Sequence, residues 1–208
     1  KSYWVKANYQ LSTGYGFKAL KIFRGSQHHE ELAAVLLALA RTLTELGNVQ
    51  KAHEFIHEAL ALAREHGEER LEAAAYREHS YLLAESNHLD SALTYVDKGI
   101  ALFRKHNDSL EMSVLFGRKS RIFFQQKKFA DSKRYAYQAL IIDSLVGNRR
   151  GLGISFYQAA QNEHALGNNE KAIELLKHSI RINGTIGNLT WQIKAHELLA
   201  TLYLENGQ

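Results

Sequence analysis

The chain has 208 residues, enough for one or two domains with a substantial core, and it contains no proline and no cysteine. Helix interiors exclude proline, so its absence favours long helices, and the absence of cysteine excludes disulfides and thiolate chemistry. The formal net charge of +4 is segregated: residues 1–27 and 112–150 carry +5 and +7, while residues 28–111 carry −7, as expected either of solvated helix faces or of a bipolar surface suited to a charged partner or to self-association.

Along the chain, apolar residues recur at i, i+3, i+4 and i+7 in stretches that end at glycine or asparagine, which indicates amphipathic helices. The stretches come in pairs, and we name the first helix of a pair A and the second B. The chain begins with a lone helix B and ends with a lone helix A. In chain order we predict a half repeat 1–26, repeats 33–66, 73–106, 113–146 and 153–186, and a half repeat 190–208.

The pairs repeat every 40 residues, and a period of this length is typical of a solenoid. An aliphatic residue occurs once per period, and so does a small residue. The aliphatic row is Leu20, Leu60, Ile100, Leu140 and Ile180. One small row is Ala40, Ser80, Ser120, Ala160 and Ala200, and another is Ser12, Ala52, Ala92, Ser132 and Ala172. We expect the small rows to let helices A and B approach closely, and stacked pairs to bury the aliphatic rows.

The turns follow the same period. Gly or Asn, which tolerate the left-handed conformation that ends a helix, occupy almost every turn position. These positions are Gly47, Asn87, Lys127, Gly167 and Gly207 in one column, and Gly67, Asn107, Gly147 and Gly187 in the other. Lys127 is the exception, and a lysine adopts the left-handed conformation less readily than glycine or asparagine.

These features resemble the tetratricopeptide repeat (TPR) family. Four segments match its second-helix signature: LGNVQKAHEFIHEAL (46–60), SNHLDSALTYVDKGI (86–100), QKKFADSKRYAYQAL (126–140) and LGNNEKAIELLKHSI (166–180). The chain departs from the family in its 40-residue period, longer than the usual 34, and in lacking the proline after helix B. The resemblance implies an all-α, right-handed superhelical solenoid of antiparallel helix pairs in a single domain, similar to the long-period repeats of bacterial signalling regulators.

The resemblance also implies that helices A line a concave groove that binds proteins or peptides. Mapped onto this chain, the inward columns form a basic, aromatic and amide-rich stripe, which suits a peptide of acidic character. The predicted partner-binding residues are Arg41, Arg77, Tyr81, Arg118, Arg121, Phe124, Gln125, Tyr157, Gln158, Gln161 and His164. We expect Gln158 and Gln161 to bond the backbone of an extended peptide. The terminal half repeats lack a polar cap, so self-association through them is a further possibility.

Two histidine motifs could hold a metal. His53-Glu54-Phe55-Ile56-His57 has the H-E-x-x-H spacing of zinc proteases, in which two histidines bind the ion and the glutamate acts as general base. These residues occupy ordinary helix-B columns that we expect to face outward, and no third ligand stands out in the sequence. His28 and His29 lie in a turn that reads as a solvated loop. We therefore predict no metal, no cofactor and no enzymatic activity.

The most favoured function is a protein- or peptide-binding scaffold or sensor module, the regulatory segment of a larger bacterial signalling protein such as a histidine kinase or transcription regulator. A peptide-pheromone-type receptor is one alternative, although its groove would be rich in asparagine. Nucleic-acid binding through the basic residues 118–134 is another, which the acidic stretch 28–111 opposes. No apolar run approaches the roughly 20 residues of a membrane-spanning helix, and no signal peptide is apparent. We expect a cytoplasmic location, with a periplasmic one still open.

Overall fold

The computed structural model describes the backbone of residues 3–205 and the side chains of residues 9–205. These residues form ten helices and no strand, and none of the ten is long and apolar enough to cross a membrane. The chain divides into two compact units, residues 1–106 (unit 1) and 107–208 (unit 2). Unit 1 contains α1 (Tyr3–Phe23), α2 (His29–Leu46), α3 (Val49–Glu65), α4 (Glu69–Glu85) and α5 (Leu89–Lys105). Unit 2 contains α6 (Ser109–Gln125), α7 (Phe129–Leu145), α8 (Arg149–Ala165), α9 (Asn169–Thr185) and α10 (Leu189–Glu205).

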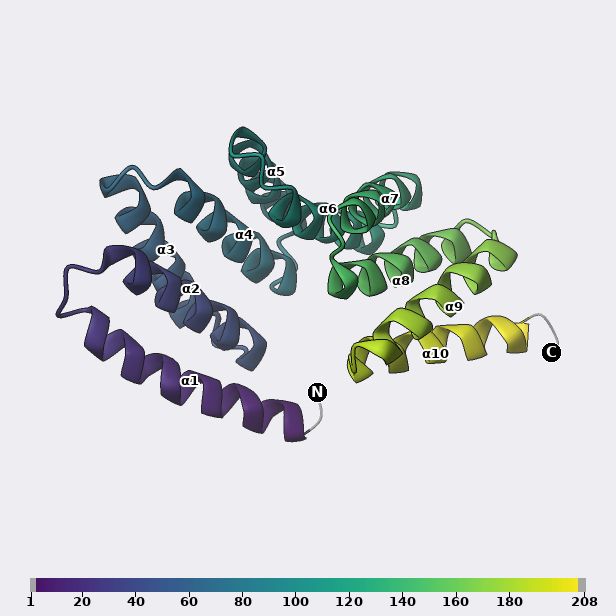
Figure 1. Cartoon of the computed structure of the whole chain (residues 1–208), viewed down its shortest axis with the longest axis horizontal. Coiled ribbons are helices and arrows are strands. Elements are labelled where there is room, and N and C mark those ends of the chain that lie inside the picture. The colour runs from purple at the N-terminus through teal and green to yellow at the C-terminus, as the bar shows by residue number, and fades with distance from the viewer. Residues whose placement is uncertain (1–2, 206–208) are drawn as a thin grey trace. The chain divides into compact units, whose positions relative to one another are not determined.

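Within each unit, consecutive helices pack against one another as pairs (Figure 1). The pairs are α2 with α3, α4 with α5, α6 with α7 and α8 with α9. Every helix from α3 to α10 has 17 residues. Three-residue turns join these helices, and this constant geometry produces the 40-residue period. The all-α fold of paired helices is therefore confirmed.

The turns take the conformation that the glycine and asparagine columns predict. The middle residue of each turn has a positive φ, from 54° at Asn107 to 83° at Gly167. The following residue donates its backbone N–H back into the helix, as Asn48 does to the carbonyl of Leu43 at 2.9 Å, which satisfies an otherwise unpaired carbonyl. Lys127 adopts the same conformation, with φ 60°, although its side chain disfavours it.

Helices A begin earlier than the predicted repeats. They start at residues 29, 69, 109 and 149, four residues before the predicted starts at 33, 73, 113 and 153. Two of these starts are set by a capping side chain, since Asp108 accepts the N–H of Glu111 at 3.2 Å and Asn148 accepts that of Gly151 at 3.1 Å. Such a cap satisfies a free N–H group in the first helical turn. Helix A can therefore begin directly after the loop that precedes it.

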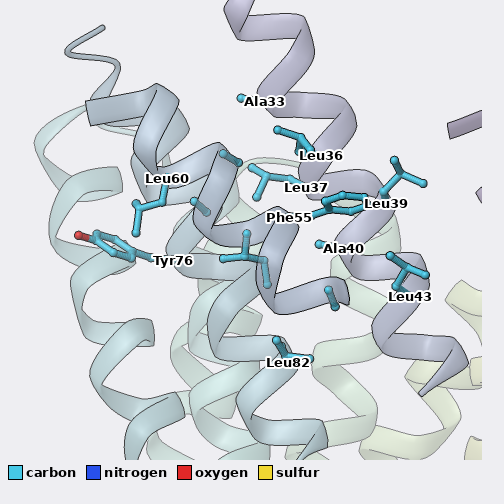
Figure 2. Close-up of a cluster of buried hydrophobic side chains, with 14 of the residues drawn as sticks. Ala33, Leu36, Leu37, Leu39, Ala40, Leu43, Phe55, Leu60, Tyr76 and Leu82 are labelled. Carbon is cyan, nitrogen blue, oxygen red and sulfur yellow. The ribbon is translucent and has the colours of Figure 1, made fainter. Parts of the chain in front are cut away.

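The core of unit 1 is apolar and lies between α2, α3 and α4 (Figure 2). Leu36, Leu39 and Ala40 of α2 face Phe55 of α3, and Leu82 of α4 closes the cluster. Full burial of a leucine or phenylalanine contributes about 1.5–3 kcal/mol, so these few side chains supply a large part of the driving force for packing.

The core of unit 2 combines small apolar residues with buried polar groups. The small rows meet as predicted: Ser132 donates to the carbonyl of Ser120 at 2.8 Å, which joins α7 to α6. Asp143 is 2% exposed and accepts hydrogen bonds from Ser113 and Ser155, both at 2.7 Å. The hydrogen bonds among these polar groups offset much of the free-energy cost of removing them from water.

Candidate partner-binding surface

Helices A lie beside one another in each unit, which is the arrangement that the binding-groove prediction requires. In unit 1, α2 contacts α4, and in unit 2, α6 contacts α8 and α8 contacts α10. The predicted residues all lie on these helices: Arg41 on α2, Arg77 and Tyr81 on α4, Arg118, Arg121, Phe124 and Gln125 on α6, and Tyr157, Gln158, Gln161 and His164 on α8. Their side chains, however, differ greatly in accessibility and in the partners that they contact.

In unit 1 the predicted arginines surround a buried glutamate. Glu78 on α4 is 3% exposed, and its Oε1 lies 2.9 Å from Nε of Arg77 and 3.5 Å from Nη1 of Arg41. Burying a carboxylate is costly unless cations or hydrogen-bond donors compensate it, and the two arginines provide that compensation. Much of the positive charge predicted for this part of the stripe is therefore already neutralised inside the protein.

Tyr81 is also engaged within unit 1. Its hydroxyl donates to the Glu45 carboxylate, and the Arg41 guanidinium lies 5.5 Å from the centre of its ring. Only 8% of Tyr81 is exposed, so it supports α2 against α4 and presents little surface to a partner. Glu45 and Glu78 lie on the same predicted inward face as the arginines, but the sequence does not show which of these residues pair.

In unit 2 the predicted residues of α6 range from buried to exposed. Arg118 is 8% exposed, Arg121 and Phe124 are half-buried, and Gln125 is exposed. The ring of Phe124 makes an edge contact with Phe129 of α7, with centroids 5.2 Å apart. Arg118 is therefore mainly a packing residue, and Gln125 is the residue of this group most open to a partner.

Gln158 does not have the free amide that the sequence predicts. Its Nε2 donates to the backbone carbonyl of Gly117 at 3.2 Å and so links α8 to α6. The amide approaches closely because position 117 is glycine; a Cβ there would lie 3.1 Å from the Gln158 Oε1. One amide hydrogen of Gln158 is therefore used within unit 2 and its Oε1 is buried, so that a bond from Gln158 to a peptide backbone stays a prediction. Gln161, one turn further along α8, is half-buried.

An aromatic pair joins α8 to α10 on the same set of helices. Tyr157 of α8 meets Trp191 of α10 edge-on, with ring centroids 5.4 Å apart. The ammonium of Lys194 lies 4.4 Å from the centre of the Trp191 ring. Burial raises the pKa of Tyr157, and the negative charge of Glu197 raises it further, so the phenol stays protonated and able to donate a hydrogen bond. Sequence reasoning found Tyr157 and missed Trp191, which has no aromatic counterpart in the other repeats.

At the end of α8, His164 contacts two elements. Its Nδ1 lies 3.0 Å from Oδ1 of Asn169 on α9, and its Nε2 lies 3.8 Å from Oε2 of Glu205 on α10. His164 is half-buried and contacts the ends of α9 and α10 from α8. It therefore packs between these helices and offers little surface to a partner.

The basic stretch 118–134 is largely tied up by internal contacts. Lys119 is 9% exposed, and its ammonium lies 4.7 Å from the Tyr135 ring centre. Lys133 pairs with Glu163 at 2.9 Å, and Arg134 pairs with Asp131 at 3.3 Å. These contacts reduce the positive surface that the sequence suggests for phosphate binding.

Histidines gather in unit 1 more closely than the sequence indicates. Ring nitrogens of His53 and His57 on α3 and of His79 on α4 all lie within 4.8 Å of one another. The expectation that no third ligand stands beside the H-E-x-x-H pair is therefore wrong. Potential ligand atoms of His29, Glu30 and Glu68 form a second group of the same kind. Glu54, the glutamate of the motif, pairs with Lys51 at 3.1 Å.

The terminal helices expose apolar side chains whose counterparts elsewhere are covered. On α10, Ile193 is 57% and Leu204 is 77% exposed. Residues 40 and 80 positions before Ile193 are the buried Gly153 and Ser113, which pack against the following helix B. On α1, Tyr15 and Ile22 are each 70% exposed. Both ends of the described chain therefore carry apolar surface.

Comparison with protein families supports the repeat assignment. A tetratricopeptide repeat model matches residues 155–185, and a model of anaphase-promoting complex subunit 5 matches residues 2–80. Among curated proteins, none matches the chain.

Solved structures with similar folds include one with a tetratricopeptide repeat sensor. One is a signal transduction ATPase with numerous domains (STAND) from Pyrococcus horikoshii, which has a tetratricopeptide repeat sensor; the TM-score is 0.77 at 19% identity, over 90% of this chain and 29% of that one. Another is BtubC from P. vanneervenii, with a TM-score of 0.69 at 16% identity, over 86% of this chain and 75% of that one. A third is aspartyl phosphate phosphatase F from Bacillus subtilis, with a TM-score of 0.66 at 12% identity, over 96% of this chain and 56% of that one. At these identities the likeness concerns the fold alone, and the chain spans less than a third of the STAND protein.

Proposed function

Since the chain is a scaffold of tetratricopeptide-type helical repeats, we propose that it binds a protein or peptide on the surface that helices A form in unit 2. The observation that carries this proposal is the Tyr157–Trp191 pair with Lys194 beside it. Tyrosine and tryptophan offer large, rigid contact area with a polar edge, and they are enriched among the residues that dominate binding energy. Gln125 and Gln161 supply accessible amides on the same helices.

We further propose that the chain acts as the sensor or regulatory segment of a larger signalling protein. Support comes from the STAND protein, whose tetratricopeptide segment is described as a sensor and whose length exceeds this chain more than threefold. A histidine kinase or a transcription regulator would fit the same organisation. In each case the repeats would bind the signal and a separate domain would give the output.

The alternatives receive less support from the contacts. Nucleic-acid binding needs free cations, whereas Lys119, Lys133 and Arg134 contact side chains of their own unit. A peptide-pheromone-type receptor remains a special case of peptide binding, and its asparagine-rich groove has no counterpart among the predicted inward residues. We also propose that the module is not an enzyme, because the glutamate of its one protease-like motif is paired with Lys51.

An acidic preference is a separate proposal, which concerns the helix-A surface of unit 1 alone. Of the four predicted arginines, Arg41 is the exposed one, with 52% of its side chain accessible. Its charge is shared with Glu78, so the preference would be modest. Replacement of Arg41 by Gln should lower the affinity of unit 1 for an acidic peptide and leave that for a neutral peptide unaffected. Equal effects on both affinities would remove this separate proposal and leave the surface of unit 2 untouched.

The binding proposal is tested by selecting peptides from a random display library on the immobilised chain and measuring the affinity of the best by calorimetry. We expect Trp191→Ala and Tyr157→Ala each to weaken that peptide at least about tenfold, because truncating a central aromatic anchor costs about 2 kcal/mol. Lys177→Ala on the exposed surface of α9 is the matched control and should leave the affinity unchanged. Selected peptides that are indifferent to both aromatic changes would contradict the assignment of the surface.

Self-association through the ends is a separate part of the proposal, supported by the apolar surface of α10. A dimer would cover Ile193 and Leu204 with a second copy of the chain. Light scattering should then give a dimer that Leu204→Glu converts to a monomer. A monomer at every concentration would remove this part and leave the peptide-binding proposal untouched.

A further inference from the structure

The H-E-x-x-H histidines are already arranged as two ligands of one ion. His53 and His57 lie one helical turn apart on α3, and their Nε2 atoms are 3.1 Å apart. Two imidazole nitrogens bound to one tetrahedral Zn²⁺ at about 2.0–2.1 Å lie about 3.3 Å from each other. The pair therefore needs almost no rearrangement to chelate a cation. Both side chains are exposed, which gives an ion a direct route from solvent.

His79 completes the group from the neighbouring helix. The centre of its ring lies 5.3 Å from each of the other two rings, and its plane stands at 79° to that of His53 and 77° to that of His57. It therefore occupies an equivalent position relative to both. The ring is held in place by Tyr95 of α5, whose centroid is 4.1 Å away, so the third ligand is oriented before any ion arrives.

His79 also has a buried polar atom that packing does not explain. The residue is 3% exposed, and its Nδ1 makes no hydrogen bond to any residue that the structure describes. A buried polar atom without a partner costs free energy, and native proteins rarely keep one without a structural or functional reason. A cation bound through Nδ1 would supply such a reason, because the bond would give this atom a partner.

The protonation state suits metal binding. Burial lowers the pKa of His79 to about 4, with further lowering by His57, His53 and Lys98. Burial likewise lowers the pKa of His57, with additional contributions from His53 and Arg64. Neutral imidazole is the form that binds metals, so little proton release opposes binding near neutral pH.

We propose that His53, His57 and His79 form a binding site for a divalent transition-metal cation, with Zn²⁺ the best fit, which links α3 to α4 and so joins one helix pair to the next. Three imidazoles are a ligand set of zinc, and the exposed side of the site leaves a fourth position for water or an external ligand. The nearby cations Lys98 and Arg64 oppose a further positive charge, so the affinity should be below that of a closed structural site. Glu54, the glutamate of the H-E-x-x-H motif, pairs with Lys51 and is not needed as a ligand.

Titration of the metal-free, untagged chain with ZnCl₂ by calorimetry is the primary experiment. We expect one Zn²⁺ per chain with a Kd of about 10 µM or tighter, and a zinc-dependent rise in the unfolding temperature. Co²⁺ in place of Zn²⁺ should give the intense visible absorption of a tetrahedral ion. Absence of binding at this level, or a Co²⁺ spectrum typical of an octahedral, mostly hydrated ion, would overturn the proposal.

Variants identify the ligands. His53→Gln and His57→Gln alter exposed side chains, so both variants should fold. Each should lower the affinity for Zn²⁺ at least about tenfold, because it removes one of three ligands. His29→Gln, which disrupts the second histidine–carboxylate group, is the matched control and should bind Zn²⁺ as the unmodified chain does. Loss of binding in His29→Gln with retention in His53→Gln would place the ion elsewhere and overturn the proposal.

The third ligand separates this site from a simple surface pair. His79→Gln should lower the affinity for Zn²⁺ as much as the other two changes. An unchanged affinity would mean that only His53 and His57 bind the ion, which would contradict the proposal. Because His79 is buried, this variant could lose stability. The ¹⁵N chemical shifts of the His79 ring in the unmodified chain provide the independent measurement: one ring nitrogen should shift on addition of Zn²⁺, and an unshifted ring would reject the third ligand.

Discussion

The helix pair α2 and α3 of unit 1 and the pair α8 and α9 of unit 2 share the same turns and nearly the same lengths, yet their interiors differ in chemistry. Between α2 and α3 the large buried side chains are apolar, with Leu36, Leu39 and Ile56 each at most 2% exposed. In α8 and α9 the buried side chains include Asn162, Glu163 and Asn183, each at most 3% exposed.

This difference shows which part of the repeat is constrained. Both pairs have the small residues that let the helices approach closely, and both have a turn with a positive-φ glycine. The remaining interior positions accept apolar or polar residues, and the polar ones are only partly hydrogen-bonded. Asn183 donates to the carbonyl of Ser179 at 2.9 Å, while its Oδ1 is buried without a partner among the described residues. Unit 1 is accordingly stabilised mainly by apolar burial, and unit 2 relies more on hydrogen bonds, which depend on geometry and pH.

Loss of the buried carboxyl of Asp143 should have the largest effect. Asp143→Ala removes the acceptor of the Ser155 hydroxyl and of the Asn148 amide, and leaves Ser113 only the carbonyl of Leu110. We expect a loss of about 3–5 kcal/mol of unfolding free energy. Urea denaturation followed by circular dichroism measures it. Ser144→Ala, at the exposed neighbouring position, is the control, and similar effects of the two changes would refute the dependence of unit 2 on this network.

A cavity in the apolar core of unit 1 should cost somewhat less. Leu36 is 0% exposed, and Leu36→Ala should lower the unfolding free energy by about 3 kcal/mol through lost burial and the cavity that remains. Hydrogen exchange should show faster opening of α2 to α4 than of α8 and α9. Uniform acceleration throughout both units would mean that the two interiors are not stabilised separately.

Acid should weaken unit 2 through Glu163. Burial acts to raise the pKa of this carboxyl, but hydrogen bonds from Tyr137, Lys133 and Asn168 outweigh it and hold the pKa below its usual value. A depressed pKa contributes stability that is present above the unfolded-state pKa and is lost as the pH falls through the folded-state pKa.

Glu163→Gln removes this titration, so the variant should be less stable than the unmodified chain at pH 7, and the gap should narrow between about pH 5 and pH 3. Thermal unfolding across that range is the measurement. A gap that is constant with pH would show that Glu163 does not titrate with folding.

The smallest effect should come from the one turn that lacks glycine or asparagine. Lys127 has φ 60°, a conformation that costs a residue with a Cβ about 1 kcal/mol. Lys127→Gly should therefore stabilise the chain by up to about 1 kcal/mol, reduced by the greater freedom of glycine in the unfolded state. Gly167→Ala, with φ 83°, is the opposite change and should destabilise; an equal sign for both would contradict the role of the turn conformation.

Much of the fold was predictable because it depends on local rules. The turn at Gly47 and the small residues Ala40 and Ala52 occur at fixed spacing, and the structure places them as expected. Helices A start four residues before the predicted repeats, because the apolar signature lies inside the repeat whereas side chains such as Asp108 and Asn148 cap the helix ahead of it.

The candidate surface was less predictable because a column shows which residues share a face and not which of them pair. Glu78 occupies the same face as Arg41 and Arg77, and only the packed helices reveal that it neutralises them. Gln158 likewise lies on the predicted inward face, and only the structure shows that its amide donates to the carbonyl of Gly117. The aromatic partner Trp191 escaped notice because no other repeat carries an aromatic residue in its column.

The sequence by itself determined the helix pairs, their 40-residue period and the turn conformations, because backbone preferences and amphipathic spacing act over a few neighbouring residues. Tertiary structure alone decided which polar side chains face one another across helices. The H-E-x-x-H motif shows the distinction: the sequence places His53 and His57 one turn apart, whereas the approach of His79, 22 residues after His57 and on the next helix, depends on how α4 packs against α3.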